Sequence, residues 1–231
     1  MCLKKAYAVI AAAGSGRRMG GVSKPNIELL GKSLFEYVLE AVDKSRIDGV
    51  CVACSEDNED SLRVLAQGFK KPISFTRGGD TRAESVKNGI EALPKDAYLV
   101  CVHDCARPFV TADMINAALE AAEKQGASCV CSAVTDTIKQ RDALTGFVST
   151  PERSSLFAVQ TPQCFKKSLY MHAASAVGAN LCDFTDETSL LEEIGVEVCY
   201  ITRPETNMKL TGIDDIPIAE ILMKRRGTAQ C

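Results

Sequence analysis

Short apolar runs alternate with amphipathic stretches along this chain, and that alternation sets the expected fold. Most runs are continuous, which is typical of strands in a parallel sheet whose two faces are both covered by helices. The expected strands are 6–12, 49–54, 73–76, 98–103, 128–134, 157–160 and 197–202. The expected helices are 33–44, 57–68, 82–93, 112–125, 166–178, 186–194 and 214–225. This order predicts an α/β fold with a doubly wound, mostly parallel sheet.

One stretch, residues 135–155, departs from this rhythm. It contains no convincing helix, and residues 142–146 indicate a turn between two short strands. An excursion of about 20 residues in a compact domain is more often a functional arm or lid than a slack loop. Since no internal repeat or interdomain linker is visible, we expect one domain, 1–231, with a protruding β-arm inserted at about 135–155.

Composition and charge narrow the class of protein. The chain has 231 residues, is 46% hydrophobic and carries a formal net charge of −3, which is ordinary for a globular protein. That balance offers no electrostatic reason to expect nucleic acid or a membrane as partner. No apolar run approaches the roughly 18 residues needed to cross a bilayer, and the N-terminal run is too short for a signal peptide. We therefore expect a cytoplasmic protein.

Eleven cysteines raise the question of disulfides or a metal site. The number is odd, and the chain is longer than a small disulfide scaffold. Cys51 and Cys54 form a CxxC pattern inside an expected strand, where residues three apart point to opposite faces. No second CxxC pattern or nearby histidine supports zinc. We interpret these cysteines as buried, reduced thiols that pack as small apolar side chains.

A glycine-rich segment follows the first expected strand and carries the clearest sign of chemistry. Residues 11–20 read AAAGSGRRMG, and Lys24 and Pro25 lie just beyond. Ligands of open α/β sheets bind outside the carboxyl ends of the strands, where glycines let backbone N–H groups approach phosphate oxygens. Met19 breaks the dinucleotide pattern G-x-G-x-x-G, and no Gly-Lys-Ser/Thr triplet completes a P-loop. The segment predicts a polyphosphate site of another kind; the alternative is a glycine-rich turn with solvated basic residues.

Two further polar clusters accompany this segment. His103, Asp104 and Arg107 close an expected strand and put a carboxylate and a guanidinium at its carboxyl end. That arrangement suits a metal–phosphate ligand, although a structural salt bridge between Asp104 and Arg107 is the alternative. Thr81 and Glu84 have capping-box spacing before an expected helix, which alone indicates only a well-capped helix.

Seven motifs, in their order and spacing, resemble one family. They are GSGRRM at 14–19 with Lys24-Pro25, GGDTRAES at 78–85, HDCARP at 103–108, DTIK at 136–139, QTPQ at 160–163, TDE at 185–187 and NMKLT at 207–211. From residue 6 to about 222 the chain resembles the 2-C-methyl-D-erythritol 4-phosphate cytidylyltransferases of non-mevalonate isoprenoid synthesis. The resemblance implies a Rossmann-like nucleotidyltransferase fold and transfer of CMP from CTP to the polyol phosphate, with release of pyrophosphate and use of Mg²⁺.

The resemblance also assigns roles to individual residues. Contacts to CTP are implied for Ala12, Ala13, Gly14, Ser15, Gly16, Gly79, Asp80, Ser85, Asp104 and Cys105, with Asp104 also the implied metal ligand. Substrate contacts are implied for Asp104, Arg107, Thr137, Arg153, Thr161, Thr185 and Lys209. Catalytic roles are implied for Arg18, Lys24, Arg153 and Lys209. A twofold homodimer is implied as well, in which the arm carries Arg153 into the partner's site.

The implied reaction agrees with the residue types. The attacking group is a phosphate oxygen, whose second pKa of about 6 leaves it largely deprotonated at pH 7, so no general base is needed. The reaction does need relief of the repulsion between two anions, which Arg18, Lys24, Lys209 and Mg²⁺ would supply. Two alternatives stay open: a sister cytidylyltransferase acting on ribitol 5-phosphate, against which Lys139 argues, and a nucleotide-binding module without turnover.

Overall fold

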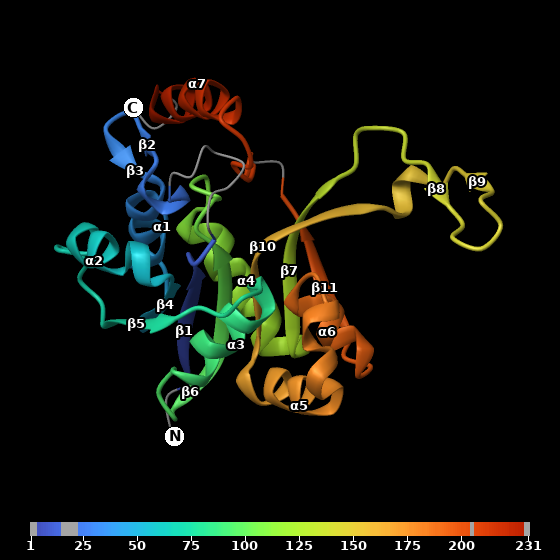
Figure 1. The fold of residues 1–231 in the computed structure, drawn as a ribbon, viewed down its shortest axis with the longest axis horizontal. Helices are drawn as coiled ribbons and strands as arrows, with labels where there is room; N and C mark the ends of the chain where they lie inside the picture. The colour runs from blue at the N-terminus through green and yellow to red at the C-terminus, as the bar shows by residue number, and fades with distance from the viewer. Residues whose placement is uncertain (1–3, 15–22, 204–205, 229–231) are drawn as a thin grey trace.

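A seven-stranded sheet forms the centre of the computed structural model, which describes residues 4–14, 23–203 and 206–228 (Figure 1). Its strands stand in the order β11 (Val198–Thr202), β7 (Ala127–Ala133), β10 (Phe157–Lys166), β6 (Ala97–Asp104), β1 (Lys5–Ala11), β4 (Gly49–Cys54) and β5 (Ile73–Arg77). Neighbouring strands are parallel except at β10, which runs antiparallel to β6 and β7. The predicted α/β fold with a mostly parallel sheet is confirmed.

Helices cover both faces of this sheet. One face is covered by α1 (Leu34–Asp43), α2 (Glu56–Leu65) and α4 (Ala112–Gln125), and the other by α3 (Arg82–Glu91), α5 (Lys167–Val177) and α6 (Glu187–Glu193). Successive side chains of β1 pack on opposite faces of the sheet. Ala8 and Ile10 belong to the hydrophobic core cluster on one face, and Tyr7 and Val9 belong to the cluster on the other. Burial on both faces is the reason that the strands appear as continuous apolar runs in the sequence.

Strand β10 is longer than predicted, and its antiparallel direction was not predicted. It extends from Phe157 to Lys166, whereas residues 157–160 were predicted. Its pairing with β7 shifts register between Val159 and Gln163, on either side of Pro162. Proline has no backbone N–H to donate and interrupts a strand pattern, so the sequence indicates an end where the strand continues.

A small layer at the top of the sheet in Figure 1 was not predicted in full. It consists of the hairpin β2 (Glu28–Leu29) and β3 (Lys32–Ser33) packed on α7 (Asp215–Thr228). Leu30 and Gly31 form the hairpin turn with φ angles of 54° and 79°. Leucine is not a residue that favours a positive φ, so the sequence pattern does not indicate this turn.

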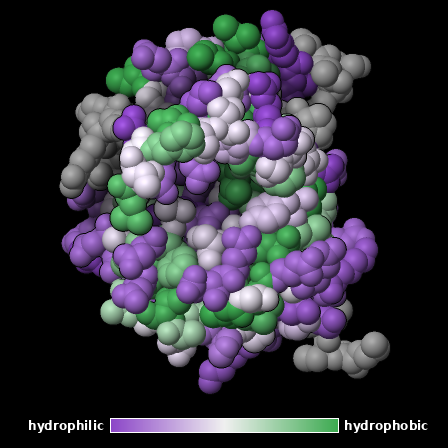
Figure 2. Space-filling view, turned by 90° about the vertical axis from the view of Figure 1, so that its right-hand side faces the viewer, coloured by the Kyte–Doolittle hydropathy of each residue, from purple (hydrophilic) through white to green (hydrophobic). Residues whose placement is uncertain are grey.

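Residues 134–156, called the arm below, leave the sheet between β7 and β10 (Figure 1). Its tip is the hairpin of β8 (Gln140–Arg141) and β9 (Val148–Ser149). The Asp142 carboxylate accepts hydrogen bonds from the N–H groups of Leu144 and Thr145, at 3.0 and 2.7 Å, and so holds the predicted turn. Figure 2 views the molecule from the side that carries the arm, where hydrophobic surface lies among hydrophilic surface.

The cysteines of the CxxC pattern are free thiols in the core. Cys51 and Cys54 belong to opposite core clusters, as expected for residues three apart in a strand. Burial raises the pKa of Cys54 to about 11, so its thiol stays protonated at neutral pH. The interpretation as buried, reduced thiols is confirmed for this pair.

Across residues 4–14, 23–203 and 206–228, no helix combines the length and apolar character that a membrane span requires.

Candidate active site

A cavity of about 650 Å³ opens at the carboxyl ends of β1, β5 and β6. Its size is in the range of pockets that bind small molecules and cofactors. The predicted site residues that line it are Ala12, Ala13, Gly14, Lys24, Gly79, Asp80, Ser85, Asp104, Cys105 and Lys209. Residues that line it without having been predicted are Ala11, Pro25, Thr81, Arg82 and Ala106. Segments far apart in the chain therefore meet here because parallel strands bring their carboxyl ends to one edge.

The turn between β5 and α3 is shaped by its own hydrogen bonds. The Gly79 N–H donates to Ser85 Oγ at 3.0 Å, and Ser85 Oγ donates to the Thr81 carbonyl at 2.9 Å. Thr81 caps α3, since its Oγ1 accepts the Glu84 N–H at 3.1 Å while the Glu84 carboxylate accepts the Thr81 N–H at 3.0 Å. The predicted capping box is confirmed, and the Ser85 hydroxyl is engaged in the same turn.

Two glycines in this turn lie where a side chain would not fit. A Cβ on Gly78 would stand 2.4 Å from the Ala13 Cβ and 2.9 Å from Ser85 Oγ. A Cβ on Gly79 would stand 2.3 Å from the Glu84 Cβ. Neither site has room for a side chain, so the approach of the turn to Ala13 depends on Gly78, and the packing of the turn against α3 depends on Gly79.

Asp104, the last residue of β6, lies at the centre of a cluster of cations. Its Oδ1 accepts a hydrogen bond from Arg82 Nε at 2.9 Å, and its Oδ2 accepts one from Lys209 Nζ at 2.7 Å. Arg107 Nε lies 3.7 Å from the same Oδ2. Burial opposes the charge of Asp104, but Arg82 and Lys209 outweigh this effect and hold the pKa of the carboxyl well below its usual range. The carboxylate therefore stays ionised.

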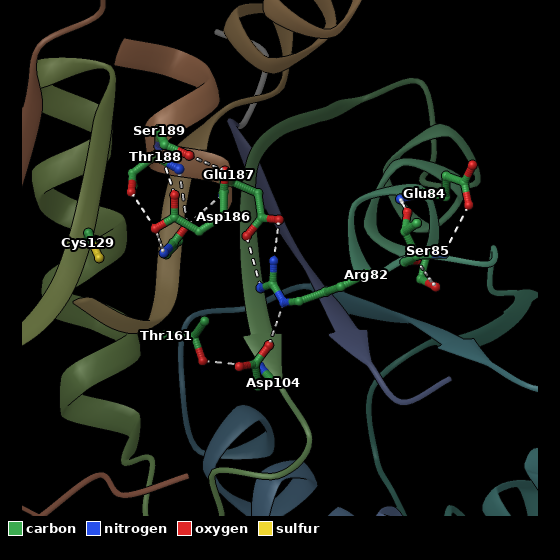
Figure 3. Close-up of polar contacts among 12 residues, drawn as sticks. Arg82, Glu84, Ser85, Asp104, Cys129, Thr161, Asp186, Glu187, Thr188 and Ser189 are labelled. Carbon is green, nitrogen blue, oxygen red and sulfur yellow. Dashed lines mark hydrogen bonds and ion pairs between the residues drawn. The ribbon is translucent and has the colours of Figure 1, made fainter. Parts of the chain in front are cut away.

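Arg82 joins this cluster to helix α6 (Figure 3). Its Nη1 and Nη2 donate to the two carboxylate oxygens of Glu187 at 2.8 and 3.1 Å. Burial disfavours the guanidinium charge, yet the carboxylates of Glu187 and Asp104 raise the pKa of Arg82 above its ordinary value. Sequence reasoning missed both Arg82 and Glu187. The available signal was a cation in the first turn of α3, where the helix dipole favours an anion.

Lys24 connects the cavity to the loop before α7. Its Nζ donates to the Leu210 carbonyl at 3.2 Å and to the Thr211 carbonyl at 3.5 Å. The Leu210 N–H donates in turn to the Ala106 carbonyl at 2.8 Å. The ammonium groups of Lys24 and Lys209 thus belong to one cavity, although 185 positions separate them in the sequence (209 − 24).

Thr161 and Arg107, both predicted to contact substrate, do not line the cavity. Thr161 Oγ1 accepts the Asp104 N–H at 3.1 Å and lies 2.9 Å from His103 Nδ1. His103 Nε2 lies 3.1 Å from the Arg107 carbonyl, which can only accept, so Nε2 carries the ring proton and Nδ1 accepts from Thr161. Arg107 Nη1 donates to the Asn207 carbonyl at 2.8 Å. Both side chains hold the loops together in this arrangement.

Thr137 and Arg153 lie together on the arm, away from this cavity. Arg153 Nη2 donates to Thr137 Oγ1 at 3.1 Å, and both residues are exposed. Neither lines the cavity, and neither does Thr185, which is exposed immediately before the Asp186 cap of α6. The predictions for Ser15, Gly16 and Arg18 concern residues outside the described ranges.

Asp104 is the residue predicted to bind a metal ion. Mg²⁺ takes oxygen ligands, typically one or two carboxylates together with the phosphates of a nucleotide. Both oxygens of Asp104 already accept hydrogen bonds from Arg82 and Lys209, and the described ranges contain no group of three or more potential metal ligands. In this arrangement the residues do not fit a metal ion at Asp104, because Arg82 and Lys209 already neutralise the carboxylate and their charges would repel a further cation. The ligand role stays a prediction.

The open α/β sheet, the cationic cavity at its carboxyl edge and the arm define a nucleotide-binding α/β protein, and comparison with known proteins specifies the class as nucleotidyltransferase. A sequence profile of the IspD family, described as 2-C-methyl-D-erythritol 4-phosphate cytidylyltransferase, matches residues 6–225. The chain belongs to this family. The family resemblance inferred from the seven motifs is therefore confirmed, as is the cytidylyltransferase class.

Individual relatives match over nearly the full length. A 2-C-methyl-D-erythritol 4-phosphate cytidylyltransferase of Crocosphaera subtropica is 38% identical over 227 residues, covering 96% of this chain and 99% of the relative. One of Thermosynechococcus vestitus is 35% identical over 224 residues, covering 95% and 96%. The crystal structure of 4-diphosphocytidyl-2C-methyl-D-erythritol synthase from Anaerococcus prevotii is similar with a TM-score of 0.86 at 28% identity, covering 96% of this chain and 99% of that one.

Proposed function

We propose that this protein transfers CMP from CTP to 2-C-methyl-D-erythritol 4-phosphate, giving 4-diphosphocytidyl-2-C-methyl-D-erythritol and pyrophosphate. The product is a precursor in the non-mevalonate route to isoprenoids. The observation that carries this proposal is the cavity that Lys24 lines and in which Arg82 and Lys209 bind Asp104, in a chain that matches the cytidylyltransferase family over residues 6–225. A nucleotide-binding module without turnover does not agree with that family.

The nucleotide would lie between the two glycine-bearing walls of the cavity. The backbone of residues 12–16 would approach one side of CTP, and Gly79 and Asp80 the other, with Ser85 keeping the second wall in shape. The triphosphate would face Lys24 and Arg18. Support for this placement comes from the cavity that these residues line at the carboxyl ends of the strands, the position at which open α/β sheets bind their ligands.

The chemistry follows from charge rather than from a general base. A phosphate oxygen of the polyol attacks the α-phosphorus of CTP, the new P–O bond forms, and the bond to the β-phosphate breaks with its electron pair leaving on pyrophosphate. His103 is no candidate for a base, since both ring nitrogens are engaged and burial lowers its pKa to about 4. Lys24 and Lys209 would offset the repulsion between the two anions and the charge that develops at the α-phosphorus.

The arm supports a twofold homodimer as part of the proposal. Its apolar side chains are exposed, with Leu144 at 96% and Phe147 at 71%, and an isolated hairpin has too little core to be stable alone. We expect the arm to pack on a second copy of the chain and to carry Thr137 and Arg153 to the partner's cavity. The forked donors of Arg153 would then hold the substrate phosphate, a geometry that lysine cannot reproduce.

The proposal also covers the domain organisation, the location and the partners of the protein, and the role of Thr185. The chain would act as one domain, 1–231, with the arm inserted at about 135–155, and as a cytoplasmic enzyme. Its net charge of −3 offers no attraction for nucleic acid or anionic lipid. Thr185, exposed before α6, would contact the polyol phosphate.

An assay of pyrophosphate release tests the proposed function. CTP is supplied with 2-C-methyl-D-erythritol 4-phosphate, with ribitol 5-phosphate, or without a polyol phosphate to measure background hydrolysis. We expect turnover with methylerythritol phosphate and clearly less with ribitol phosphate. A preference for ribitol phosphate would assign the protein to the sister activity, and the absence of pyrophosphate with either substrate would overturn nucleotidyl transfer altogether.

A further inference from the structure

Two helices of the cavity begin opposite each other and are joined by their first residues. Helix α3 begins with Arg82 after the Thr81 cap, and α6 begins with Glu187 after the Asp186 cap. Figure 3 shows Arg82 reaching from α3 between Glu187 and Asp104. Because α3 follows the proposed nucleotide turn and α6 follows Thr185, this contact links the nucleotide side of the cavity to its substrate side.

The contact is an ion pair between a buried carboxylate and a partly buried guanidinium. The Glu187 side chain is 3% exposed and that of Arg82 is 28% exposed. Two apolar side chains of similar volume are often as stabilising as a buried ion pair, because desolvation of the charges offsets their attraction. Stability is therefore a weak reason for this pair, and its geometry points to another role.

Every nitrogen of the Arg82 guanidinium is committed to a carboxylate. Nη1 and Nη2 bind Glu187, and Nε binds Oδ1 of Asp104. The group is planar and rigid, so Glu187, by holding one edge, fixes the direction in which Nε points. The Asp104 carboxylate is then oriented so that its Oδ2 meets Lys209 Nζ at 2.7 Å. Glu187 therefore acts on Lys209 through two intermediate side chains.

Glu187 also keeps the Arg82 charge away from other anions. If Glu187 lost its charge, Arg82 would retain only Asp104 as an acidic partner and would be free to turn toward a bound triphosphate. Asp104 would then lose the contact that orients it toward Lys209. CTP would then be bound by Arg82 as an additional cation. The ammonium of Lys209 would be displaced from its position beside the reacting phosphates.

We propose that Arg82 and Glu187 form a positioning pair: Glu187 holds Arg82, Arg82 orients Asp104, and Asp104 keeps the ammonium of Lys209 beside the reacting phosphates. The inference rests on the proposed transfer of CMP. The pair acts through Asp104 and Lys209 and not by contact with the polyol phosphate.

The test compares Glu187→Gln and Arg82→Lys with a matched pair of controls, Glu123→Gln and Arg46→Lys. Arg46 and Glu123 also form an ion pair at 2.8 Å, but it lies outside the cavity, and its side chains are 41% and 31% exposed. For each variant, kcat and KM are measured by pyrophosphate release, CTP affinity by calorimetry, and folding by thermal unfolding.

We expect Glu187→Gln to bind CTP at least as tightly as the wild type, because the released Arg82 faces an anion. Its kcat should fall about 10-fold to 10²-fold, the range that a small misplacement of a reacting or charged group produces. Arg82→Lys should lose kcat to a similar extent, since an ammonium has no rigid fork that binds Glu187 with two nitrogens and directs a third to Asp104. The two controls should match the wild type in kcat and CTP affinity. A pair that only stabilises the fold would lower the unfolding temperature and leave kcat and CTP affinity of the folded protein unchanged.

A double variant, Arg82→Met with Glu187→Leu, separates positioning from stability even where a single variant does not fold. Replacing both charges by apolar groups is often neutral for stability, so we expect a folded protein with low kcat. A folded double variant with wild-type kcat, or wild-type kcat in both single variants, would overturn the positioning role. A wild-type protein that releases no pyrophosphate would instead count against the proposed function, so the two failures are distinguishable.

Discussion

The hydroxyl of Thr161 accepts the backbone N–H of Asp104 at 3.1 Å, so that β10 fixes the carboxyl end of β6. Thr161 is 3% exposed, and its one O–H donor is directed to Nδ1 of His103 at 2.9 Å. A residue predicted to contact the substrate is therefore hydrogen-bonded to the backbone that carries a central carboxylate of the cavity. Its effect on activity should be accompanied by an effect on the stability of the free protein.

Thr161→Val should destabilise the free protein, because it leaves the Asp104 N–H and His103 Nδ1 buried without partners. Each unsatisfied group costs about 1–3 kcal/mol, while Thr161→Ser keeps the hydroxyl and should stay close to the wild type. Urea unfolding without ligands measures the difference. A threonine that met only the substrate would leave unfolding of the free protein unchanged in Thr161→Val.

The buried ring of His103 should make stability depend on pH. Burial lowers the pKa of His103 to about 4 in the folded protein, whereas an unfolded histidine titrates near 6.5. Between about pH 4 and pH 6.5, the unfolded chain therefore binds a proton at His103 that the folded protein does not bind. Stability from this group is complete above pH 6.5 and declines as the pH falls toward 4, by up to about 1.4 kcal/mol per pH unit.

The chain contains only two histidines, which makes this prediction simple to check by NMR and by unfolding. The signal that disappears in His103→Gln identifies His103, and we expect it not to titrate between pH 5.5 and 8. Between pH 6.5 and 4, the free energy of unfolding of His103→Gln should depend less on pH than that of the wild type. His172→Gln, which changes an exposed position, should keep the pH dependence of the wild type. A titration of His103 near pH 6.5 would contradict the proposed burial and hydrogen bonding.

Lys24→Ala should lower turnover strongly at saturating CTP. Removal of one preorganised charge contact in a transition state typically reduces the rate about 10²-fold to 10³-fold. Lys70→Ala serves as the control. Lys70 is exposed and lies before the amino end of β5, whereas the cavity lies at the carboxyl ends of the strands. Near-wild-type turnover in Lys24→Ala would show that the assigned role of this ammonium is wrong.

Mixing inactive subunits tests whether the arm completes the partner's site. Lys24→Ala and Arg153→Ala subunits are combined under conditions that allow exchange. With shared sites, one site of each mixed dimer holds both intact residues, so random pairing in a twofold dimer should restore roughly a quarter of wild-type activity. Sites built within one chain would restore none. A mixture of Lys24→Ala subunits with themselves provides the background.

The arrangement of strands and helices was largely readable from the sequence. Strands buried on both faces appear as continuous apolar runs, and Thr81 and Glu84 marked the start of α3 by their spacing. The direction and length of β10 were not readable. Its apolar pattern is the same in either orientation, and Pro162 interrupts the pattern where pairing with β6 and β7 continues.

For the site, the sequence by itself determined which residue types could bind a nucleotide and that they follow strand ends, because glycine, cation and carboxylate motifs are local. Only the tertiary structure decided how they divide their roles. Lys24 and Lys209 both line the cavity, whereas Thr161 and Arg107 form hydrogen bonds with backbone groups outside its lining. The link from Glu187 through Arg82 to Asp104 joins three elements. Partners so distant in sequence leave no local pattern, since their contact depends on how helices pack on the sheet.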